Sequence, residues 1–402
     1  MLTGKNILVG QSGGPTAVIN ASLAGVVSAG RALGAKVYGM RYGVQGLLEG
    51  RVVDLLPILS EKELALLKRT PSSYLGSCRM KLPYPDENPA PFEKIFALLA
   101  EKNIGAVFYI GGNDSMDAVS ELSAYGESVG SPVRFIGVPK TIDNDLACTD
   151  HTPGYGSAAR YIARVTREVV LDALVYDQKR ITILEIMGRD AGWLTGAAAL
   201  AHGKNFEGPD FIYLPEVPLD VDDFCRRVVE KQKTKKSLVI AVSEGIRTTE
   251  GHYVCEATAM NPNYKDAFGH RDISGTARAL CDILAAQCGC KARAVEINVL
   301  QRCAAHFASE TDIREAFEAG EFAVKAAQDG HTGVMVVFER ESDVPYRCRM
   351  SLCSIYEIAN AVRLVPVDWI LPYGEGMTEE FLRYARPLAD MDEDEEGLPA
   401  LS

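Results

Sequence analysis

Short apolar runs separated by stretches of helical periodicity constrain the fold of this chain more than any other feature. The runs lie at residues 6–10, 106–111, 134–138, 180–187, 237–243, 294–299 and 333–338. Each run is apolar on both faces of an extended chain, which is typical of a central strand in a parallel sheet covered by helices. Between them, residues 92–99 place four apolar side chains on one helical face: Phe92, Ile95, Phe96 and Leu99. The pattern predicts an α/β fold.

The length of 402 residues predicts two domains. The net charge of −12 opposes nucleic-acid binding, because clustered Lys and Arg hold phosphate backbones. Six acidic residues and no basic residue fall within 390–396, so we expect 390–402 to be a solvated acidic tail.

A mean hydropathy of −0.01 leaves no room for membrane spans. Residues 1–10 lack the basic start and longer apolar stretch of a signal peptide, so we expect a cytoplasmic protein. The ten cysteines occur singly apart from Cys288 and Cys290. This spacing favours reduced thiols over a disulfide framework or a zinc site.

The first apolar run ends in a glycine-rich turn at residues 10–15, followed by a segment at 16–27 that we expect to be a helix. Ligands of open α/β sheets bind beyond the carboxyl ends of the strands. Gly13 and Gly14 would let backbone N–H groups approach an anion there, so the turn predicts a phosphate site. Two alternatives are a purely structural tight turn and the G-x-S-x-G turn of a serine hydrolase.

Carboxylates directly follow the next two predicted strands. Residues 111–115 read GGNDS, which suggests a phosphate with a divalent cation, or instead an Asx cap for a helix starting near Met116. Residues 138–145 read VPKTIDND, in which Asp143 and Asp145 point the same way in an extended chain. This loop offers a phosphate ligand, a general base and a metal or orienting group, although a simple polar turn is the alternative.

Glycines beside charged residues also follow two later apolar runs, at residues 187–190 and 243–245. Several arginines also lie near glycine turns or strand ends: Arg79, Arg180, Arg189, Arg293 and Arg302. One such arginine is more often a solvated charge. Together, in an acidic protein, they favour a phosphorylated substrate.

In chain order, the motifs QSGGPTAVIN, YLGSCR, YIGGNDSM, PKTIDND, EIMGRDAGW and VSEG resemble the phosphofructokinase family over about residues 5–310. The resemblance implies two Rossmann-like lobes, each a mainly parallel sheet flanked by helices. A larger lobe of residues 1–155 and about 301–350 would bind the phosphoryl donor. A smaller lobe of about 156–300 and 351–389 would bind the sugar phosphate. The implied site lies between lobes and partly at a subunit interface, so we expect a homodimer or homotetramer.

The resemblance also implies roles for individual residues. Asp143 would be the general base that deprotonates the 1-hydroxyl of fructose 6-phosphate, Glu244 would contact sugar hydroxyls, and Arg79 would lie beside the transferred phosphoryl group. The implied catalytic residues are Asp143, Thr141, Arg189, Lys140 and Arg79. The implied donor-binding residues are Gly13, Gly14, Gly112, Asn113, Asp114, Ser115 and Lys140. The implied sugar-phosphate residues are Thr141, Asp143, Asp145, Met187, Gly188, Arg189, Glu244 and Arg302, with Arg180 and Arg293 from a neighbouring subunit.

Asp114 and Lys140 stand where ATP-using members of the family carry glycine. Asp114 would fill the space of the α-phosphate and nucleoside and repel it, whereas Lys140 would attract pyrophosphate. The resemblance therefore implies reversible phosphoryl transfer from pyrophosphate to fructose 6-phosphate, giving fructose 1,6-bisphosphate and phosphate. Mg²⁺ is the implied cofactor, with Asp114 as its ligand. The alternatives are an ATP-dependent phosphofructokinase and a non-catalytic regulatory subunit that binds sugar phosphates.

The chain departs from the family pattern at several positions. Asn113 replaces a magnesium-associated Asp of many relatives, which puts the protein ligands of the metal in doubt. Val299 replaces a histidine that contacts the sugar phosphate, so one contact would be lost or supplied elsewhere. Ala24 and Ser28 replace two effector-binding arginines, so we expect no nucleotide regulation at that place. A longer segment, which includes residues 264–270, resembles an insertion of the pyrophosphate branch and has no assigned role.

Overall fold

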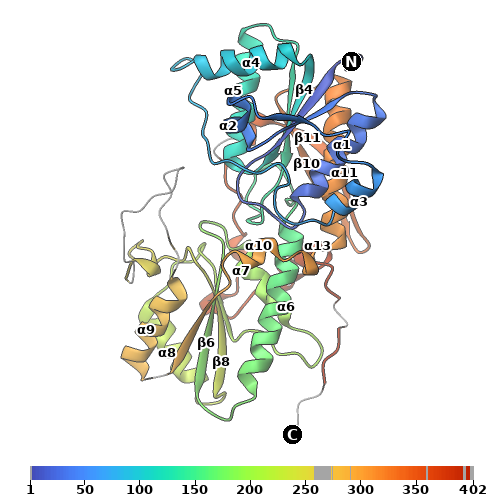
Figure 1. The fold of residues 1–402 in the computed structure, drawn as a ribbon. Helices are drawn as coiled ribbons and strands as arrows, with labels where there is room; N and C mark the ends of the chain where they lie inside the picture. Colours follow the sequence, from blue (N-terminus) through green and yellow to red (C-terminus); the bar gives the residue numbers. More distant parts are fainter. Residues whose placement is uncertain are drawn as a thin grey trace. The chain divides into compact units, whose positions relative to one another are not determined.

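The chain forms two compact units in a computed structural model that describes residues 2–257, 273, 275–289, 291–358, 361–392 and 395–398 (Figure 1). Unit 1 comprises Met1–Gly154 and Glu310–Val362, and unit 2 comprises Tyr155–Ser309 and Arg363–Ser402. The insertion at 264–270 lies outside the described residues.

Unit 1 is built on a seven-stranded sheet in the order β11-β10-β5-β4-β1-β2-β3. Its strands are β1 (Asn6–Gln11), β2 (Val37–Met40), β3 (Val52–Asp54), β4 (Ile104–Gly111), β5 (Arg134–Pro139), β10 (Val334–Asp343) and β11 (Tyr346–Ser354). The inner strands are parallel, whereas β3 and β11 pair antiparallel at the two edges. All eight residues of β4 are buried, because helices cover both faces of the sheet. The predicted α/β class with mainly parallel sheets is confirmed.

Two sets of helices cover this sheet: α1 (Ile19–Ala32), α3 (Glu61–Leu67) and α11 (Glu310–Asp329) on one face, and α2 (Gly43–Leu48), α4 (Ala90–Glu101), α5 (Asn113–Ser128) and α12 (Ile355–Ile358) on the other. The predicted face of α4 is confirmed, since Phe92, Ile95 and Leu99 are buried and the half-buried Phe96 packs against the same core. Helix α1 packs closely on α11, where Ala24 is buried and Ser28 donates to Glu321 Oε1 at 3.1 Å. The two positions that lack effector arginines therefore form a helix contact.

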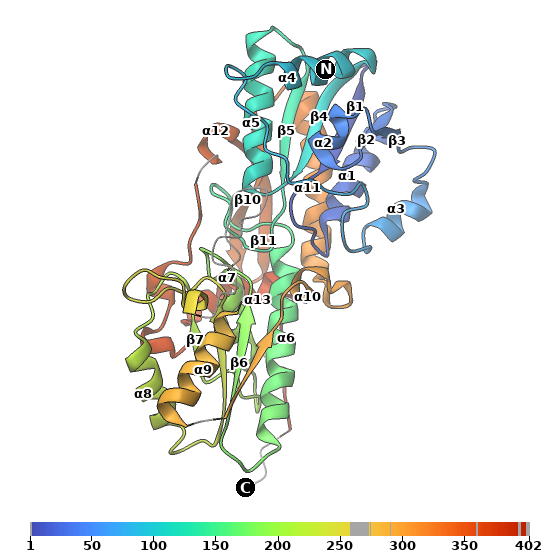
Figure 2. The same cartoon turned by 60° about the vertical axis from the view of Figure 1, so that its left-hand side comes forward.

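Unit 2 contains a four-stranded parallel sheet in the order β7-β8-β6-β9. Its strands are β6 (Arg180–Ile186), β7 (Phe211–Tyr213), β8 (Ser237–Ser243) and β9 (Ala292–Glu296), and its helices are α6 (Tyr155–Leu174), α7 (Trp193–Gly196), α8 (Val221–Lys231), α9 (Thr276–Cys288), α10 (Leu300–Cys303) and α13 (Glu379–Leu388). Helix α6 lies on one side of the sheet, and α8 and α9 lie on the other (Figure 2). Each unit therefore has its own covered sheet.

The observed elements correct the predicted bounds at several places. The strand predicted at 294–299 is β9, which begins two residues earlier, at Ala292, and ends at Glu296. The helix predicted from residue 16 begins at Ile19, because Thr16 Oγ1 accepts the backbone N–H of Ile19 at 2.9 Å and so stays outside the helix. The chain returns to unit 2 at Arg363 rather than at 351, because β11 pairs with β10.

The acidic tail is not simply solvated, contrary to the prediction. Glu395 forms ion pairs with Arg164 and with Arg167, the latter at 2.9 Å, and Gly397 donates to Lys204 O at 2.7 Å. The described part of the tail is therefore anchored to unit 2. Among the helices of the described residues, none is both long and apolar enough to cross a membrane.

Candidate functional site

The glycine turn after β1, the GGNDS turn after β4 and the PKTIDND loop after β5 meet at one edge of the sheet of unit 1. This follows from the strand order, because β5, β4 and β1 are parallel neighbours whose carboxyl ends point the same way. Backbone hydrogen bonds join them directly: Lys140 N donates to Gly111 O at 3.0 Å, and Ser12 N donates to Ile110 O at 3.0 Å. Three motifs that are far apart in the sequence therefore form one cluster.

Lys140 is the centre of this cluster. Its side chain is almost fully buried, and Nζ donates to the carbonyl oxygen of Gly14 at 2.8 Å. Gly13 has a φ of +78°, and a Cβ atom there would lie 3.1 Å from Lys140 Nζ. The backbone conformation favours glycine, and a Cβ would be in tight contact with the lysine. The ammonium group and the glycine turn, which we call the cationic cradle, could together hold an anion.

The segment that carries Arg79 lies beside the same turn. Gly13 N donates to Cys78 O at 3.3 Å, and Ser77 Oγ donates to Gly13 O at 2.6 Å. Arg79 follows directly and is exposed. The backbone that carries Arg79 therefore lies next to the glycine turn.

The loop that carries Asp143 is fastened on both sides of this residue. Asn144 is fully buried with a φ of +57°, and its Oδ1 accepts the backbone N–H of Thr152 at 3.0 Å. Thr152 Oγ1 in turn donates to Thr141 O at 2.8 Å. Thr141 Oγ1 accepts from Asp143 N at 3.1 Å and lies 3.3 Å from its carboxylate. The Asp143 carboxylate is therefore held in one orientation by neighbours in its own loop.

Helix α5 begins at Asn113 with Gly112 at the N-cap position, and no side chain caps it. The alternative of an Asx cap and a helix start near Met116 is therefore wrong. Ser115 folds back over the end of β4, since a Cβ at Gly111 would lie 1.9 Å from its Oγ. Helix α5 therefore begins directly after β4, and the partial positive charge of a helix N-terminus favours an anion.

The Asn113 side chain provides a direct test of whether a cation fits. Its Nδ2 donates to Asp145 Oδ2 at 3.0 Å, while its buried Oδ1 has no hydrogen-bond partner among the described residues. An unpartnered amide oxygen beside a carboxylate, with exposed Asp114 as the next residue, is the oxygen-rich donor set that Mg²⁺ prefers. The Asn113 amide oxygen and the Asp145 carboxylate could therefore hold a divalent cation together, and Asp114, the ligand expected from the sequence, directly follows Asn113 in the chain.

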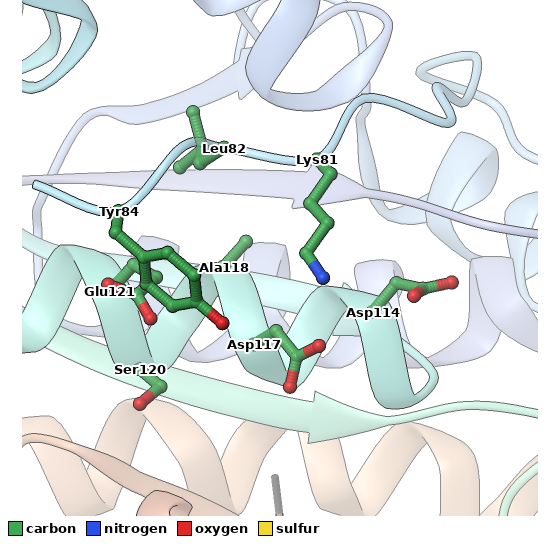
Figure 3. A pocket seen from close by; sticks show the side chains of 8 residues that line it. All are labelled: Lys81, Leu82, Tyr84, Asp114, Asp117, Ala118, Ser120 and Glu121. Carbon is green, nitrogen blue, oxygen red and sulfur yellow. The ribbon is translucent and has the colours of Figure 1, made fainter. Parts of the chain in front are cut away.

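A pocket of about 150 Å³ opens along α5 from Asp114 (Figure 3). Its lining residues are Lys81, Leu82, Tyr84, Asp114, Asp117, Ala118, Ser120 and Glu121. Burial and the charge of Asp114 raise the pKa of Asp117, and burial with the charges of Asp117 and Asp86 raises the pKa of Glu121. Figure 3 shows the ammonium group of Lys81 pointing toward α5 between these acids. The pocket is therefore strongly acidic with a single lysine in its wall.

A second cluster lies at the carboxyl ends of β6 and β8 in unit 2. Gly188 N donates to Glu244 Oε1 at 3.3 Å, and Met187 N donates to Gln301 Oε1 at 3.1 Å. Gly188 has a φ of +139°, and a Cβ there would lie 2.5 Å from Ala191 O. The structure thus brings together Met187, Gly188, Arg189 and Glu244, and Gln301 ties them to the helix of Arg302. Sequence reasoning missed Gln301, although its place directly before Arg302 was a usable signal.

Arg180 and Arg293 lie elsewhere in unit 2. Arg180 is the first residue of β6, and Arg293 pairs in register with Thr182 near the same end. At about 3.3 Å per residue, Arg180 is roughly 20 Å along β6 from Met187. Within one chain, these two arginines therefore do not join the cluster around Glu244.

The end of the MGRDAGW motif is structural. Trp193 is fully buried and packs against Trp369, Phe381 and Tyr384, and its Nε1 donates to Arg363 O at 3.0 Å. This aromatic cluster anchors the loop that begins at Met187 on its C-terminal side.

Comparisons with known proteins agree with these observations. The family model described as "Phosphofructokinase" matches residues 6–327. A pyrophosphate–fructose 6-phosphate 1-phosphotransferase of Methylococcus capsulatus is 38% identical over 97% of this chain and 92% of its own length, and one of Xanthomonas campestris is 38% identical over 99% and 96%. The crystal structure of a pyrophosphate-dependent phosphofructokinase from Nitrosospira multiformis matches with a TM-score of 0.85 and 33% identity, covering 99% of this chain and 94% of that one. The chain belongs to the phosphofructokinase family.

Proposed function

We propose that this chain catalyses the reversible transfer of a phosphoryl group from pyrophosphate to the 1-hydroxyl of fructose 6-phosphate, giving fructose 1,6-bisphosphate and phosphate. The observation that carries the proposal is the pairing of Lys140 with the glycine turn, with Asp114 at the start of α5. This arrangement supplies positive charge that can bind pyrophosphate. It also places a carboxylate where the larger donor ATP would extend. The names of the similar proteins support the same donor and acceptor.

In the proposed mechanism, Asp143 accepts the proton of the sugar 1-hydroxyl while the resulting oxygen attacks the nearer phosphorus in line. The P–O–P bond breaks, and phosphate leaves with the bond electrons. Lys140, the N–H groups of the glycine turn and Arg79 stabilise the negative charge that is spread over the phosphoryl oxygens. The fastening of Asp143 through Asn144 supports this role, because a general base must be held within hydrogen-bond reach of its proton.

We assign Mg²⁺ to the oxygen atoms of Asn113, Asp114 and Asp145. When bound there, the ion would neutralise pyrophosphate charge and orient it. The unpartnered Oδ1 of Asn113 supports this assignment, because a buried carbonyl oxygen without a partner is costly unless it meets a donor or a cation.

We propose that donor selection extends beyond Asp114 along α5. Asp114, Asp117 and Glu121 line one pocket that opens from the donor cluster. A nucleoside triphosphate reaching past the cradle would bring its α-phosphate toward this wall. Two like charges about 4 Å apart repel by about 1 kcal/mol in water and by about 4 kcal/mol near a protein surface. Pyrophosphate ends before the wall and avoids that repulsion.

On the acceptor side, we propose that Glu244 binds sugar hydroxyls while Arg189 and Arg302 hold the sugar phosphate. Along the strand direction, Arg180 lies about 20 Å and Arg293 about 16 Å from this cluster, which supports a role at the site of a second copy. We therefore propose a homodimer or homotetramer, located in the cytoplasm, whose monomer is inactive. Activity that disappears on dilution in parallel with dissociation, followed by light scattering, tests this proposal.

The donor proposal is tested with Asp114→Gly in a coupled assay with saturating fructose 6-phosphate and Mg²⁺. Removing the carboxylate should raise kcat/KM for ATP by at least about tenfold, which corresponds to about 1.4 kcal/mol of lost repulsion. Asp222→Gly is the matched control, because Asp222 is also an exposed aspartate in the first turn of a helix. If Asp114→Gly leaves ATP use unchanged, exclusion by this carboxylate is refuted.

A further inference from the structure

Two thiols and a carboxylate meet in unit 1 at a place with no role in the proposed reaction. One ligand atom each from Cys148, Cys353 and Glu357 lies within 4.8 Å of the other two. Cys353 Sγ is 3.8 Å from Glu357 Oε2. Cys148 and Glu357 are exposed, so an ion could reach the three atoms from solvent.

The spacing of these atoms suits a single tetrahedral ion. Zinc binds sulfur at about 2.3 Å and carboxylate oxygen at about 2.0–2.2 Å, so two ligand atoms on a tetrahedral ion are about 3.5–3.8 Å apart. The distance between Cys353 Sγ and Glu357 Oε2 already has this value. The remaining separations are at most 4.8 Å, which side-chain rotation can reduce.

The backbone holds the ligands in place before any ion binds. Thr149 Oγ1 accepts the N–H of Phe338 at 2.9 Å, and Asp150 N donates to Phe338 O at 2.9 Å, so the residues that follow Cys148 are fastened to β10. Cys353 lies on β11 directly opposite Met335 of β10. Both thiols are thus positioned by the same hairpin, and binding would need little ordering of the chain.

The chemistry of the set selects a class of metal. Thiolates are soft ligands that favour zinc and related ions, whereas Mg²⁺ takes oxygen ligands. We propose that Cys148, Cys353 and Glu357 form a site for a zinc-class divalent cation, with water in the fourth position. Binding releases the thiol protons and closes a bridge between the segment that follows Asp145 and the β11–α12 junction. The two cysteines are far apart in the sequence, which explains why their spacing gave no indication of a metal site.

The test uses Co²⁺ as a spectroscopic probe for the reduced full-length protein in the absence of phosphates. We expect one equivalent of Co²⁺ to give a thiolate-to-cobalt charge-transfer band in the near ultraviolet and visible bands typical of tetrahedral geometry. Zn²⁺ should displace it stoichiometrically. In Cys353→Ser the charge-transfer band should weaken and the affinity should fall by more than about tenfold, since even outer-shell partners change metal affinity by 10- to 100-fold. Glu357→Gln should lower the affinity while both thiolate bonds remain.

Cys348→Ser is the matched control. Cys348 belongs to a second group of possible ligands with His151 and Glu315, whose three atoms also lie within 4.8 Å of one another. Unchanged binding in Cys348→Ser together with loss in Cys353→Ser supports the proposed site, with circular dichroism confirming that both variants fold. Binding that survives Cys353→Ser, or a wild-type protein without a thiolate band, overturns it. A disulfide between Cys148 and Cys353, identified by peptide mapping under non-reducing conditions, would also overturn it. None of these results depends on the phosphoryl donor.

Discussion

A buried histidine beside the Asp143 loop gives unit 1 a defined dependence of stability on pH. His151 is 3% exposed, its Nδ1 is 2.8 Å from Asp150 Oδ1, and its Nε2 is 2.8 Å from Glu315 Oε2. Burial by itself would lower the pKa of His151, but the charges and hydrogen bonds of Glu315 and Asp150 outweigh it and raise the pKa to about 9. The imidazolium therefore links the segment after Asp143 to helix α11.

The magnitude follows from linkage between protonation and folding. The pKa of His151 is about 9 in the folded protein and about 6.5 in the unfolded chain, and each pKa unit is worth about 1.36 kcal/mol. Protonated His151 therefore contributes about 3 kcal/mol to the free energy of unfolding. Because the folded pKa is raised, this contribution is fully present below about pH 6.5 and is lost as the pH rises through about 9.

The perturbation is His151→Gln, which keeps hydrogen-bonding capacity but removes the charge. Urea unfolding followed by far-ultraviolet circular dichroism gives the free energy of unfolding of both proteins between pH 6 and pH 10. We expect the wild type to exceed the variant by about 3 kcal/mol at pH 6 and the difference to vanish near pH 10. Comparing the two proteins cancels the titration of groups that do not contact His151, whereas Asp150 and Glu315 contact it directly. A difference that stays constant over this range, or that grows with pH, would refute the reasoning.

Further predictions concern the site. Asp143→Asn should lower kcat by about 10²- to 10⁴-fold with little change in either KM, and a steady-state assay in which KM rises instead would remove Asp143 from its role as base. Gly13→Ala should raise KM for pyrophosphate about tenfold, because its Cβ would lie 3.1 Å from Lys140 Nζ at a φ of +78°. Unchanged pyrophosphate kinetics would contradict anion binding at the cationic cradle. Gly188→Ala should lower the free energy of unfolding of unit 2 by about 1–3 kcal/mol, because the backbone conformation and the space at this position disfavour a Cβ. Tryptophan fluorescence measures this unfolding, since both tryptophans lie in unit 2. Wild-type stability in the variant would show that the loop relaxes freely. Chelation by EDTA should abolish turnover and Mg²⁺ should restore it, and full activity in EDTA would exclude the assigned cation.

The sequence predicted the central strands and the loops that follow them, because a strand that is buried on both faces must be a continuous apolar run. It did not predict the edge strand β11, whose residues are all half-buried or exposed and form no such run. It also could not place Asn113 against Asp145, or Glu395 against Arg167, because these contacts join segments that are distant in the sequence. Local patterns indicate which chemistry is present, and the partners of each group depend on the fold.

The ratio of kcat/KM for pyrophosphate to kcat/KM for ATP measures the donor preference of the enzyme. The measurement uses the wild-type protein with fructose 6-phosphate and Mg²⁺, and follows fructose 1,6-bisphosphate formation with each donor. The carboxylates of Asp114 and Asp117 predict a ratio of at least about 10², because two repulsive contacts of about 1.4 kcal/mol each multiply to that factor. A ratio near one, or a preference for ATP, would contradict the account.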